Sequence, residues 1–480
     1  MECEFWHQKA AVRWIREGDA NTSFCHAVVK QRRNSNFISR MKDDALGWLH
    51  DAPNIQDSAV RFFSELFQST GFVSPSTLPF ELPRITAEED AKLRELPGMD
   101  ELRSVVFSMD ANSAPGPNGF GAGFYQHCWE TIKDDLLAAI HDFFKGVEQP
   151  RGISSALIVL IPKVEGAFQW KDFRPISLCN VSSKIISEIL ANRLGHLLPR
   201  LISPWQTGFV PGRGIMDNIL LAQELVLDLD RRLTYPNLII KLDMEKAYDR
   251  VKWSFLLFML RSYGLSEFAV NLLFRTLSTS WFSVLVNGQS SGFLKSSRGV
   301  RQGDPLSPAL FLVVAEFLGR GLQMLCHNQA DMGYVSARGR VPYLAFANDM
   351  IIFTRCSETC LLALRDFLLL YQQHSGQKVN IGKSAFLSSS SLPADLDNLV
   401  GSTLGFHKQC FPLKYLGVPF ARGRMGAIIF DPLLASLRAR LFHWSSKLLS
   451  MGGKVILLRH VLSSLPLFLL QALCPPKSVL

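Results

Sequence analysis

The sharpest alternation of apolar and polar segments in the chain lies at residues 341–353. Two apolar runs, Tyr343–Ala347 and Met350–Phe353, flank the polar pair Asn348-Asp349. Aromatic and β-branched residues favour strands whereas Asn and Asp favour tight turns, so the pattern predicts a β-hairpin with the polar pair at its turn. A rigid hairpin would hold the carboxylate of Asp349 firmly enough for a metal site. An ordinary Asn-Asp turn has the same pattern, so the pair indicates function only together with other features.

A second apolar run ends on a carboxylate upstream, in the sequence LIIKLDMEKAYDR at residues 238–250. It predicts a strand that ends at Asp243 and a helix that begins near Asp249. If the two strand ends meet across one sheet, the carboxylates of Asp243 and Asp349 offer oxygen ligands to divalent metal ions. The two stretches together therefore predict a metal site at the ends of neighbouring strands.

Apolar periodicity predicts further elements along the chain. Helices are expected at residues 60–67, 129–144, 182–198, 218–232, 251–263, 309–325 and 358–375, and in the tail from residue 431, where Leu433, Leu437, Leu441 and Trp444 share a face. Strands or hairpins are expected at residues 153–161, 173–178, 283–296, 376–387 and 411–420, and Gly- and Pro-rich loops at residues 113–120, 207–214 and 298–308. Strands and helices in this order fit a small antiparallel sheet of the ferredoxin-like βαββαβ type, so the expected fold class is α+β.

The N-terminal part of the chain has a different character. Residues 1–80 are expected to be mainly helical and basic, and prolines among polar residues predict a linker at residues 74–99. With 480 residues, 48% hydrophobic residues and 34 Phe, the chain can bury large cores and is not a disordered protein. Lys and Arg outnumber Asp and Glu by 51 to 42, a net charge of +9 that suits a polyanionic partner but does not demand one.

Cysteine usage and hydropathy indicate a soluble, intracellular protein. The nine cysteines are scattered, and Cys356 and Cys360 lack the further ligands that a zinc pattern needs, so reduced thiols and no disulfide-linked partner are expected. The first residues carry charge without an apolar core, so no secretory signal is expected. The apolar stretch at residues 455–470 is interrupted by Arg459, His460 and Pro466, so no membrane span is expected there.

Beyond these patterns, the sequence resembles the reverse transcriptases of non-LTR retrotransposons, most closely the plant LINE type. The resemblance rests on motifs in family order over roughly residues 105–420: SAPGPNGF, LIPKVEGAFQWKDFRPISLCNVSSKIISEILANRL, QTGFVPGRGIMDNIL, KLDMEKAYDRVKW, RGVRQGDPLSPALF, YLAFANDMIIF, SGQKVNIGKS and YLGVPF. The N-terminal FWHQKAAVRWIREGDANTSFCH is similar to the segment that precedes this domain. The endonuclease, zinc and RNase H segments of the family are expected to be absent from this chain.

The resemblance implies a right-hand polymerase with fingers, palm and thumb around a primer–template. By this likeness residues 1–90 form a helical, basic N-terminal extension and linker, residues 91–235 the fingers, residues 236–420 the palm with the catalytic hairpin, and residues 421–480 the helical start of the thumb. The implied activity is RNA-directed DNA polymerisation. It would use an RNA template, a DNA primer, deoxynucleoside triphosphates and two divalent ions, Mg²⁺ or Mn²⁺.

The resemblance assigns the metal site to the two predicted strand ends. Asp243 matches the first palm carboxylate, and Asp349 matches the last acid of a hairpin that normally reads Phe-Ala-Asp-Asp. Asn348 therefore stands where a second metal ligand belongs. Lys383 matches a turn lysine that acts as general acid for the leaving pyrophosphate, a role that suits a Lys ammonium.

Further positions match the family's substrate contacts. Tyr248 matches the bulky gate that selects deoxynucleotides, and Gln302 and Gly303 match the loop that holds the incoming nucleotide and the template. Arg174 matches the fingers arginine on the triphosphate, with Lys163 assisting it, and Arg can clamp phosphate with two hydrogen bonds. A separate set matches the primer grip: Tyr415, Leu416 and Gly417.

Asn348 bears directly on activity. Its neutral amide removes one negative charge from a site that should hold two dications, and losing such a term commonly lowers rates by orders of magnitude. Asn118, Ser113 and Ser183 also depart from the family pattern, which is typical of a decaying element copy. Three readings follow: a full or impaired reverse transcriptase, a non-catalytic nucleic-acid-binding remnant, and a group II intron maturase. The RGVRQGDPLSP and YLGVPF motifs favour the retrotransposon branch over the maturase.

Overall fold

The computed structural model describes residues 22–69, 71, 77–328, 331–389, 392–422, 426–442 and 449–479. The chain forms two compact units. Unit 1 comprises residues 1–37, 219–227 and 409–480, and unit 2 comprises residues 38–218 and 228–408. Both predicted strand-end carboxylates belong to unit 2, whereas the predicted primer grip belongs to unit 1. The division into fingers, palm and thumb at the bounds given above stays a prediction.

The central hairpin belongs to a five-stranded sheet of unit 2. Its strands are β5 (Asn237–Leu242), β8 (Tyr343–Phe346), β9 (Asp349–Arg355), β10 (Ala385–Ser388) and β11 (His407–Lys408), in the order β11-β10-β5-β9-β8. β5 pairs antiparallel with both β9 and β10, and β8 pairs antiparallel with β9. Helices connect β5 to β8 and β9 to β10, so these four strands form the βαββαβ arrangement. The predicted α+β class with a ferredoxin-like sheet is confirmed.

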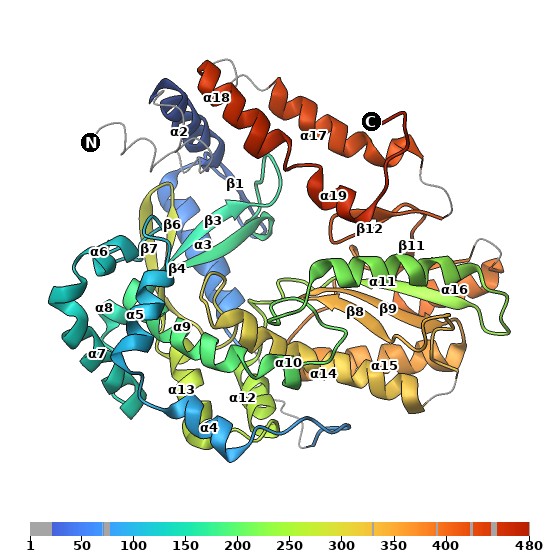
Figure 1. The fold of residues 1–480 in the computed structure, drawn as a ribbon, viewed down its shortest axis with the longest axis horizontal. Coiled ribbons are helices and arrows are strands. Elements are labelled where there is room, and N and C mark those ends of the chain that lie inside the picture. Colours follow the sequence, from blue (N-terminus) through green and yellow to red (C-terminus); the bar gives the residue numbers. More distant parts are fainter. Residues whose placement is uncertain are drawn as a thin grey trace. The chain divides into compact units, whose positions relative to one another are not determined.

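Three long helices supply the core beneath this sheet: α12 (Trp253–Ser262), α14 (Ser307–Asn328) and α15 (Glu358–Ser375). Figure 1 shows α14 and α15 on the same side of β8 and β9. The Phe317 ring of α14 stacks on Phe367 and Tyr371 of α15, with centroid distances of 5.9 and 6.2 Å. The packing is so close that a Cβ added at Gly321 would lie 1.8 Å from the Phe367 ring. Glycine is therefore required where these helices meet.

A second sheet of unit 2 has the order β4-β3-β6-β7. It consists of β3 (Ser155–Pro162), β4 (Phe173–Cys179), β6 (Trp281–Val286) and β7 (Gln289–Lys295), with β3 parallel to β6. Helix α3 (Ala52–Phe67) packs on it through Phe63 and Phe67, whose rings contact Trp170 and Phe282. The hairpin predicted around Gly288 is confirmed.

Further helices complete unit 2. They are α4 (Ala87–Arg94), α5 (Met99–Ser108), α6 (Ala122–His127), α7 (Trp129–Lys145), α8 (Arg151–Ser154), α9 (Val181–Gly195), α10 (Leu198–Leu201), α13 (Glu267–Ser278) and α16 (Ala394–Leu404), with 3₁₀ turns at Trp170–Asp172 and Asp228–Asp230. The main apolar core of the unit includes residues of α5, α7, α9 and α13 as well as the helices under the five-stranded sheet.

Unit 1 gathers both ends of the chain. Its elements are α2 (Thr22–Asn36), most of α11 (Ile215–Leu227), β12 (Leu413–Tyr415), β13 (Val418–Phe420), a 3₁₀ turn (Ala427–Phe430), α17 (Asp431–Leu441), α18 (Met451–Ile456), a π-helical segment (Leu457–Leu462) and α19 (Leu467–Ala472). Phe24, Cys25 and Val29 of α2 form an apolar cluster with Leu449, Leu457 and Val461. The helical tail is confirmed as far as Leu441, and Trp444 of its predicted face lies outside the described residues.

Several local predictions were wrong. Residues 41–49, expected to be helical, form a hairpin of β1 (Met41–Asp43) and β2 (Gly47–Leu49), because Gly47 adopts a left-handed φ of 74° at the turn. The expected linker at residues 74–99 contains α4, which begins with a reciprocal capping box between Thr86 and Glu89. Helices α13 and α16 were not predicted. Helix α12 begins at Trp253 rather than near Asp249, because turns occupy residues 245–250.

Two helical stretches of the described chain are apolar and long enough to cross a membrane by length and composition alone. In α14, 78% of the most apolar window is buried, which is typical of a core helix, whereas 6% is buried in the window at Met451–Ala472. The expectation that this second stretch does not span a membrane stays a prediction. The eight described cysteines are free thiols.

Replacement of Gly321 by Ala should destabilise the protein strongly. The new methyl group would overlap the Phe367 ring, and overpacking of this kind typically costs about 1–3 kcal/mol or more. Gly195→Ala is the matched control, since it also lies in a helix but has no heavy atom within 4 Å of the added Cβ. Urea unfolding of both variants checks the prediction. Equal stabilities of Gly321→Ala and Gly195→Ala would contradict the packing of α14 on α15.

Candidate active site

The strand register brings the two predicted carboxylates together. Leu242 pairs with Met350 as the last partners of β5 and β9, so the next residue on each side, Asp243 and Asp349, stand opposite one another. Side chains at directly opposed positions of neighbouring strands have Cβ atoms about 5 Å apart and face the same side of the sheet. Burial, and then the negative charge of Asp243, raise the pKa of the Asp349 carboxyl. The two carboxylates are therefore close enough to repel each other.

The turn of the hairpin differs from the prediction by one residue. Asp349 pairs with Phe346, so Ala347 and Asn348 form the two-residue turn and Asp349 is the first residue of β9. The predicted turn pair Asn348-Asp349 was wrong because Ala347 adopts a left-handed φ of 56°. An alanine in this conformation costs about 1–2 kcal/mol, which no propensity argument anticipates. The shift places Asp349 on a strand, where its position is fixed by the ladder.

The end of β5 is held by the turn that carries the predicted lysine. The Asp243 N–H donates to Ser384 Oγ at 3.1 Å, and the Asp243 carbonyl accepts from the N–H of Asn380 at 2.8 Å. Lys383 lies between these two partners in sequence and is exposed. The turn at residues 380–384 therefore fixes Asp243 and presents Lys383 from the same segment.

The donor atoms at these strand ends fit a hard divalent cation. Two carboxylates with mutual repulsion supply oxygen ligands, and a cation between them would remove the repulsion. Within the described ranges, no group of three or more His, Cys, Asp or Glu side chains is arranged to hold a metal ion. The site thus has two carboxylates, Asp243 and Asp349, with the neutral amide of Asn348 in the adjoining turn.

Basic side chains from separate elements gather near one another. Arg174 on β4 pairs with Ile161 on β3, two residues before Lys163. Lys163 Nζ donates to the Lys171 carbonyl at 2.8 Å. The pKa of Lys163 is lowered mainly by burial; the charge of Asp249 opposes this, while the charges of Lys383 and Arg174 lower the pKa further. The structure therefore brings Lys163, Arg174 and Lys383 into one cluster.

The sequence analysis missed a fourth cation, Lys246. Its backbone has a left-handed φ of 49°, and its Nζ lies 4.2 Å from the centroid of the Phe62 ring. Burial lowers the pKa of Lys246 to about 8, and the nearby charge of Lys163 acts in the same direction. A lone lysine gives no sequence signal, although its place three residues after Asp243, within DMEKAYDR, marked it as close to the site.

The predicted nucleotide-binding loop is bonded to β4 and to a buried carboxylate. Gln302 Nε2 donates to Asp249 Oδ1 at 2.9 Å, and the Ser177 N–H donates to the Gln302 carbonyl at 2.8 Å. Gly303 has a φ of 103°, and a Cβ there would lie 3.1 Å from the Ser177 carbonyl oxygen. Glycine is thus needed for the loop to approach the strand.

Asp249 itself is buried and was missed as a site residue. It is 3% exposed, and burial raises the pKa of its carboxyl to about 6 despite the hydrogen bond from Gln302 and the charge of Lys246. Its Oδ2 atom has no hydrogen-bond partner within the described residues. Its spacing of six residues from Asp243 was the available signal, but the sequence pattern suggested only the start of a helix.

The predicted gate residue is fixed by aromatic packing. The Tyr248 ring stacks on Phe311 of α14 with a centroid distance of 4.7 Å and an interplanar angle of 11°. The Val300 N–H donates to the Tyr248 carbonyl at 2.8 Å. Burial raises the pKa of Tyr248 well above its usual value, so the hydroxyl is neutral at physiological pH. The ring therefore has a fixed position two residues from the left-handed Lys246.

A buried ion pair anchors the same loop. Arg301 Nη2 lies 2.5 Å from Asp304 Oδ2, and both side chains are almost fully buried. Ser187 Oγ of α9 donates to Asp304 Oδ2 at 3.0 Å, and Arg301 Nη1 donates to Ser280 Oγ at 2.9 Å. Because an unpaired charge here would be costly, the pair restricts the loop to one arrangement.

These elements carry a family signature. Residues 161–420, more than half of the chain, match the family model described as reverse transcriptase (RNA-dependent DNA polymerase). The chain belongs to the reverse transcriptase family. The match includes every predicted site residue, from Lys163 and Arg174 to Tyr415, Leu416 and Gly417.

Two relatives of this chain are retrotransposon proteins. It is 28% identical over 504 residues to the "Transposon TX1 uncharacterized 149 kDa protein" of Xenopus laevis, covering 99% of this chain and 38% of that protein. It is 30% identical over 323 residues to the Pol polyprotein of the type-2 retrotransposable element R2DM of Drosophila melanogaster, covering 65% of this chain and 29% of that protein. The predicted resemblance to non-LTR retrotransposon reverse transcriptases is confirmed. The chain spans well under half the length of either relative.

One solved structure shows a weak likeness to this chain. It is that of apo telomerase from Candida tropicalis, truncated from the C-terminal domain, with a TM-score of 0.38 at 16% identity over 58% of this chain and 59% of that chain.

The predicted primer grip of this chain forms a tight turn in unit 1. Leu416 and Gly417, with φ values of 48° and 88°, connect β12 to β13. Two positive φ values in a two-residue connection are typical of a type I′ hairpin. Tyr415 is buried, and its ring meets Phe420 at a centroid distance of 6.1 Å. The accessible part of this motif is therefore the turn rather than the tyrosine.

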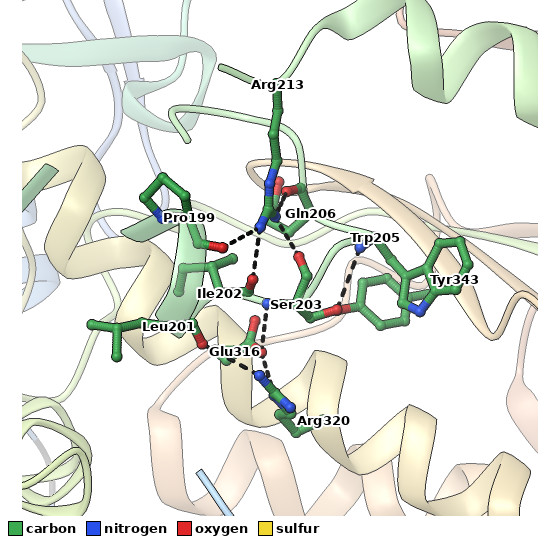
Figure 2. Close-up of polar contacts among 10 residues, drawn as sticks. All are labelled: Pro199, Leu201, Ile202, Ser203, Trp205, Gln206, Arg213, Glu316, Arg320 and Tyr343. Carbon is green, nitrogen blue, oxygen red and sulfur yellow. Dashed lines mark hydrogen bonds and ion pairs between the residues drawn. The ribbon is translucent and has the colours of Figure 1, made fainter. Parts of the chain in front are cut away.

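Behind the hairpin, a polar network fixes the loop at residues 199–213. Arg213 donates to the carbonyls of Pro199, Ile202, Ser203 and Gln206 (Figure 2). The Tyr343 hydroxyl of β8 donates to Ser203 Oγ at 2.8 Å.

The same loop is tied to α14 through a buried acid. The Ser203 N–H donates to Glu316 Oε1 at 2.9 Å, and Arg320 Nε donates to the same oxygen at 2.7 Å (Figure 2). Burial raises the pKa of Glu316 to about 7, although Arg320 opposes the shift. The loop is thus joined by side-chain hydrogen bonds to both β8 and α14.

Replacement of Asp249 by Asn should change how stability depends on pH. The folded-state pKa of Asp249 is about 6 against a usual value of 3.8, so the folded protein loses stability as pH rises through this interval. The amide keeps an acceptor for Gln302 but cannot ionise. The variant should gain up to about 3 kcal/mol relative to wild type between pH 4 and pH 7.

Denaturant unfolding at pH 4, 5, 6 and 7 tests this expectation. The highest of these pH values, 7, stays below the range near pH 8 in which Lys246 titrates. The control is Asp135→Asn on the exposed face of α7, which should differ from wild type by a constant amount. A pH-independent difference between wild type and Asp249→Asn would contradict the burial of an ionising Asp249.

Proposed function

We propose that this chain is the reverse transcriptase portion of a non-LTR retrotransposon protein and acts inside the cell on an RNA template and a DNA primer. The reaction is template-directed transfer of deoxynucleotides from their triphosphates to the primer 3′-hydroxyl. The observation that carries the proposal is the pair Asp243 and Asp349 on adjacent strand ends, in a chain of the reverse transcriptase family, beside a cluster of cations.

Reverse transcriptases as a family depend on divalent metal ions, and here Asp243 and Asp349 would hold Mg²⁺ or Mn²⁺. When bound, such ions activate the primer hydroxyl and offset the charge that develops on the leaving phosphate. The role of the protein is to hold both carboxylates in register. The N–H contact of Asp243 with Ser384, and the β9 ladder below Asp349, support this role.

The cation cluster suits the triphosphate. Arg174 can bind two phosphate oxygens at once, whereas Lys163 and Lys246 act as point charges in a partly buried setting where charge interactions are stronger. Lys383 would donate a proton to the leaving pyrophosphate, and its position on the segment that supports Asp243 favours this role. The partial burial of Lys246 favours its binding to an anion, because the anion stabilises the charged form of the lysine.

Two further residues would select the substrate. The Tyr248 ring, fixed on Phe311, is suited to press against the 2′ position of an incoming sugar and exclude a hydroxyl there. Gln302 and Gly303 would contact the nucleotide and template, and the Asp249 hydrogen bond fixes the Gln302 amide. Leu416 and Gly417 would contact the primer.

Asn348 would reduce the rate of this reaction. The site has two carboxylates and a neutral amide within the described residues, so less negative charge opposes the bound cations. The second candidate function, a nucleic-acid-binding remnant without polymerase activity, rests on the same observation. Both candidates share the binding surface, and they differ only in chemistry.

Asn348→Asp should increase Mg²⁺-dependent extension by about two orders of magnitude. The added carboxylate acts on the metal-bound reacting phosphate and not on the duplex, so template affinity should change little. Addition of Asp243→Asn to this variant should abolish the gain, because both carboxylates serve one site. Single-nucleotide extension and primer–template affinity, measured at matched protein concentration, give the two quantities.

Three outcomes would count against this view. If neither wild type nor Asn348→Asp extends the primer, the defect lies elsewhere and the nucleic-acid-binding remnant is favoured. If both proteins extend the primer equally fast, the amide is not a crippling change. If the double variant keeps the gain, Asp243 is not part of the metal site.

Binding of an RNA–DNA primer–template should weaken steeply with salt. The net charge of +9 indicates that phosphate contacts from many Lys and Arg side chains supply most of the affinity. Between 50 and 200 mM salt, we expect at least about a 100-fold loss, in line with several phosphate contacts. Fluorescence anisotropy with wild type and Asn348→Asp should give the same slope for both. Affinity that does not change with salt would contradict nucleic-acid binding through phosphates.

A further inference from the structure

The Gly- and Pro-rich loop at residues 207–214 has no role in the site described so far. In the structure it lies against the hairpin that carries Asp349. The Thr207 N–H donates to the Ala345 carbonyl at 2.9 Å, and the Ala345 N–H donates to the Trp205 carbonyl at 2.9 Å. Asn218 Nδ2 also donates to the Ala345 carbonyl, at 2.8 Å. The backbone of residues 205–207 therefore pairs side by side with β8, the outer strand of the hairpin.

The side chain of Gln206, the residue that precedes this loop, reaches the turn of the hairpin. Gln206 Oε1 accepts from the Ala347 N–H at 2.8 Å and from the Gly208 N–H at 3.0 Å, and Gln206 Nε2 donates to the Ala347 carbonyl at 3.0 Å. Both backbone polar groups of Ala347 are thus bonded to one carboxamide. Gln206 is 3% exposed, so water does not replace these bonds when they are lost.

Ala347 is the residue whose conformation decides where Asn348 and Asp349 point. Its left-handed φ of 56° is unfavourable for alanine. The Gln206 carboxamide is hydrogen-bonded to both the N–H and the carbonyl of Ala347 and so holds this conformation. Gly208 allows the approach, because a Cβ there would lie 2.3 Å from the Ala347 nitrogen. Release of Ala347 to an ordinary conformation would rotate the turn and move the following carboxylate.

Gln206 is itself held in place by the network in Figure 2. Arg213 donates to the Gln206 carbonyl at 2.6 Å and to three other carbonyls of the loop. Ser203, three residues before Gln206, is bonded to Glu316 of α14 and to Tyr343 of β8. The carboxamide therefore extends from a rigid base, as a positioning group requires.

We propose that Gln206 is a positioning residue for the active site: its carboxamide fixes the turn at Ala347 and thereby orients Asp349, which the β5–β9 register sets opposite Asp243, for binding of a divalent cation. The inference rests on the proposed function, because it assigns the two carboxylates to a metal. Gln206 touches neither substrate nor metal and acts only through the hairpin. Residues that orient metal ligands through hydrogen bonds commonly change metal affinity 10- to 100-fold when replaced.

The test measures Mn²⁺ affinity of the full chain without nucleic acid, from the electron paramagnetic resonance signal of free Mn²⁺. The parent is the Asn348→Asp protein, and Asp243→Asn in that parent identifies the site. Gln206→Met keeps the length of the side chain and removes all three hydrogen bonds, and it should weaken Mn²⁺ binding about tenfold or more. Gln126→Met is the matched control, because the Gln126 side chain is also hydrogen-bonded to the backbone, at two carbonyls, but lies on α6.

A purely structural glutamine would give a different result. Both Gln→Met variants should lower the melting temperature, but only Gln206→Met should change Mn²⁺ affinity. Equal Mn²⁺ affinity of Gln206→Met and the parent, with Asp243→Asn abolishing binding, overturns the positioning role and leaves the proposed function intact. Mn²⁺ binding that survives Asp243→Asn overturns the metal site, and with it both the proposed function and this inference.

A second variant keeps the proposal testable if Gln206→Met does not fold. In Gln206→Glu, a protonated carboxyl can reproduce all three bonds, whereas the carboxylate repels the Ala347 carbonyl. At pH 8.5, where the carboxylate form is favoured, its Mn²⁺ affinity should be several-fold lower than that of the parent at the same pH. Equal Mn²⁺ affinities of Gln206→Glu and the parent at pH 8.5 contradict a bond from residue 206 to the Ala347 carbonyl.

Discussion

The pairing of β5 with β9 is the constraint on which the site depends. Six consecutive partners, ending at Leu242 and Met350, determine that Asp243 stands opposite Asp349. A slip of one residue would turn one carboxylate to the other face of the sheet and expose apolar side chains such as Ile240 and Ile352, which are almost fully buried. The core therefore enforces the register, and the register brings together two like charges.

The two carboxylates repel each other, and neighbouring charged side chains offset part of this repulsion. Asp349 has a raised pKa, while Lys163 and Lys246 have lowered ones, because each charge is partly removed from water. Acids and bases shifted in these directions are prepared to bind cations and anions respectively.

Helix α14 supports the site from beneath. Its Phe311 holds the Tyr248 ring, and its Glu316 holds the loop that carries Gln206. The loop that leads into it contains the buried pair of Arg301 and Asp304 and presents Gln302 to Asp249. One buried helix therefore fixes Tyr248, the loop of Gln302 and the support of the hairpin, which explains why most of it is apolar and excluded from water.

The sequence by itself determined the features that depend on local pattern. Alternation predicted the hairpin at residues 343–353, the strand before Asp243 and helix α15, and the ordered motifs identified the family, because each reflects residues close together in the chain. It missed α4, α13 and the hairpin at residues 41–49, and it placed the turn one residue too late. Only the tertiary structure decided the conformation of Ala347, because that depends on Gln206, 141 residues away. Likewise, only folding joined Asp249 to Gln302, 53 residues apart, and gave Lys246 its low pKa, since desolvation is a property of the packed protein.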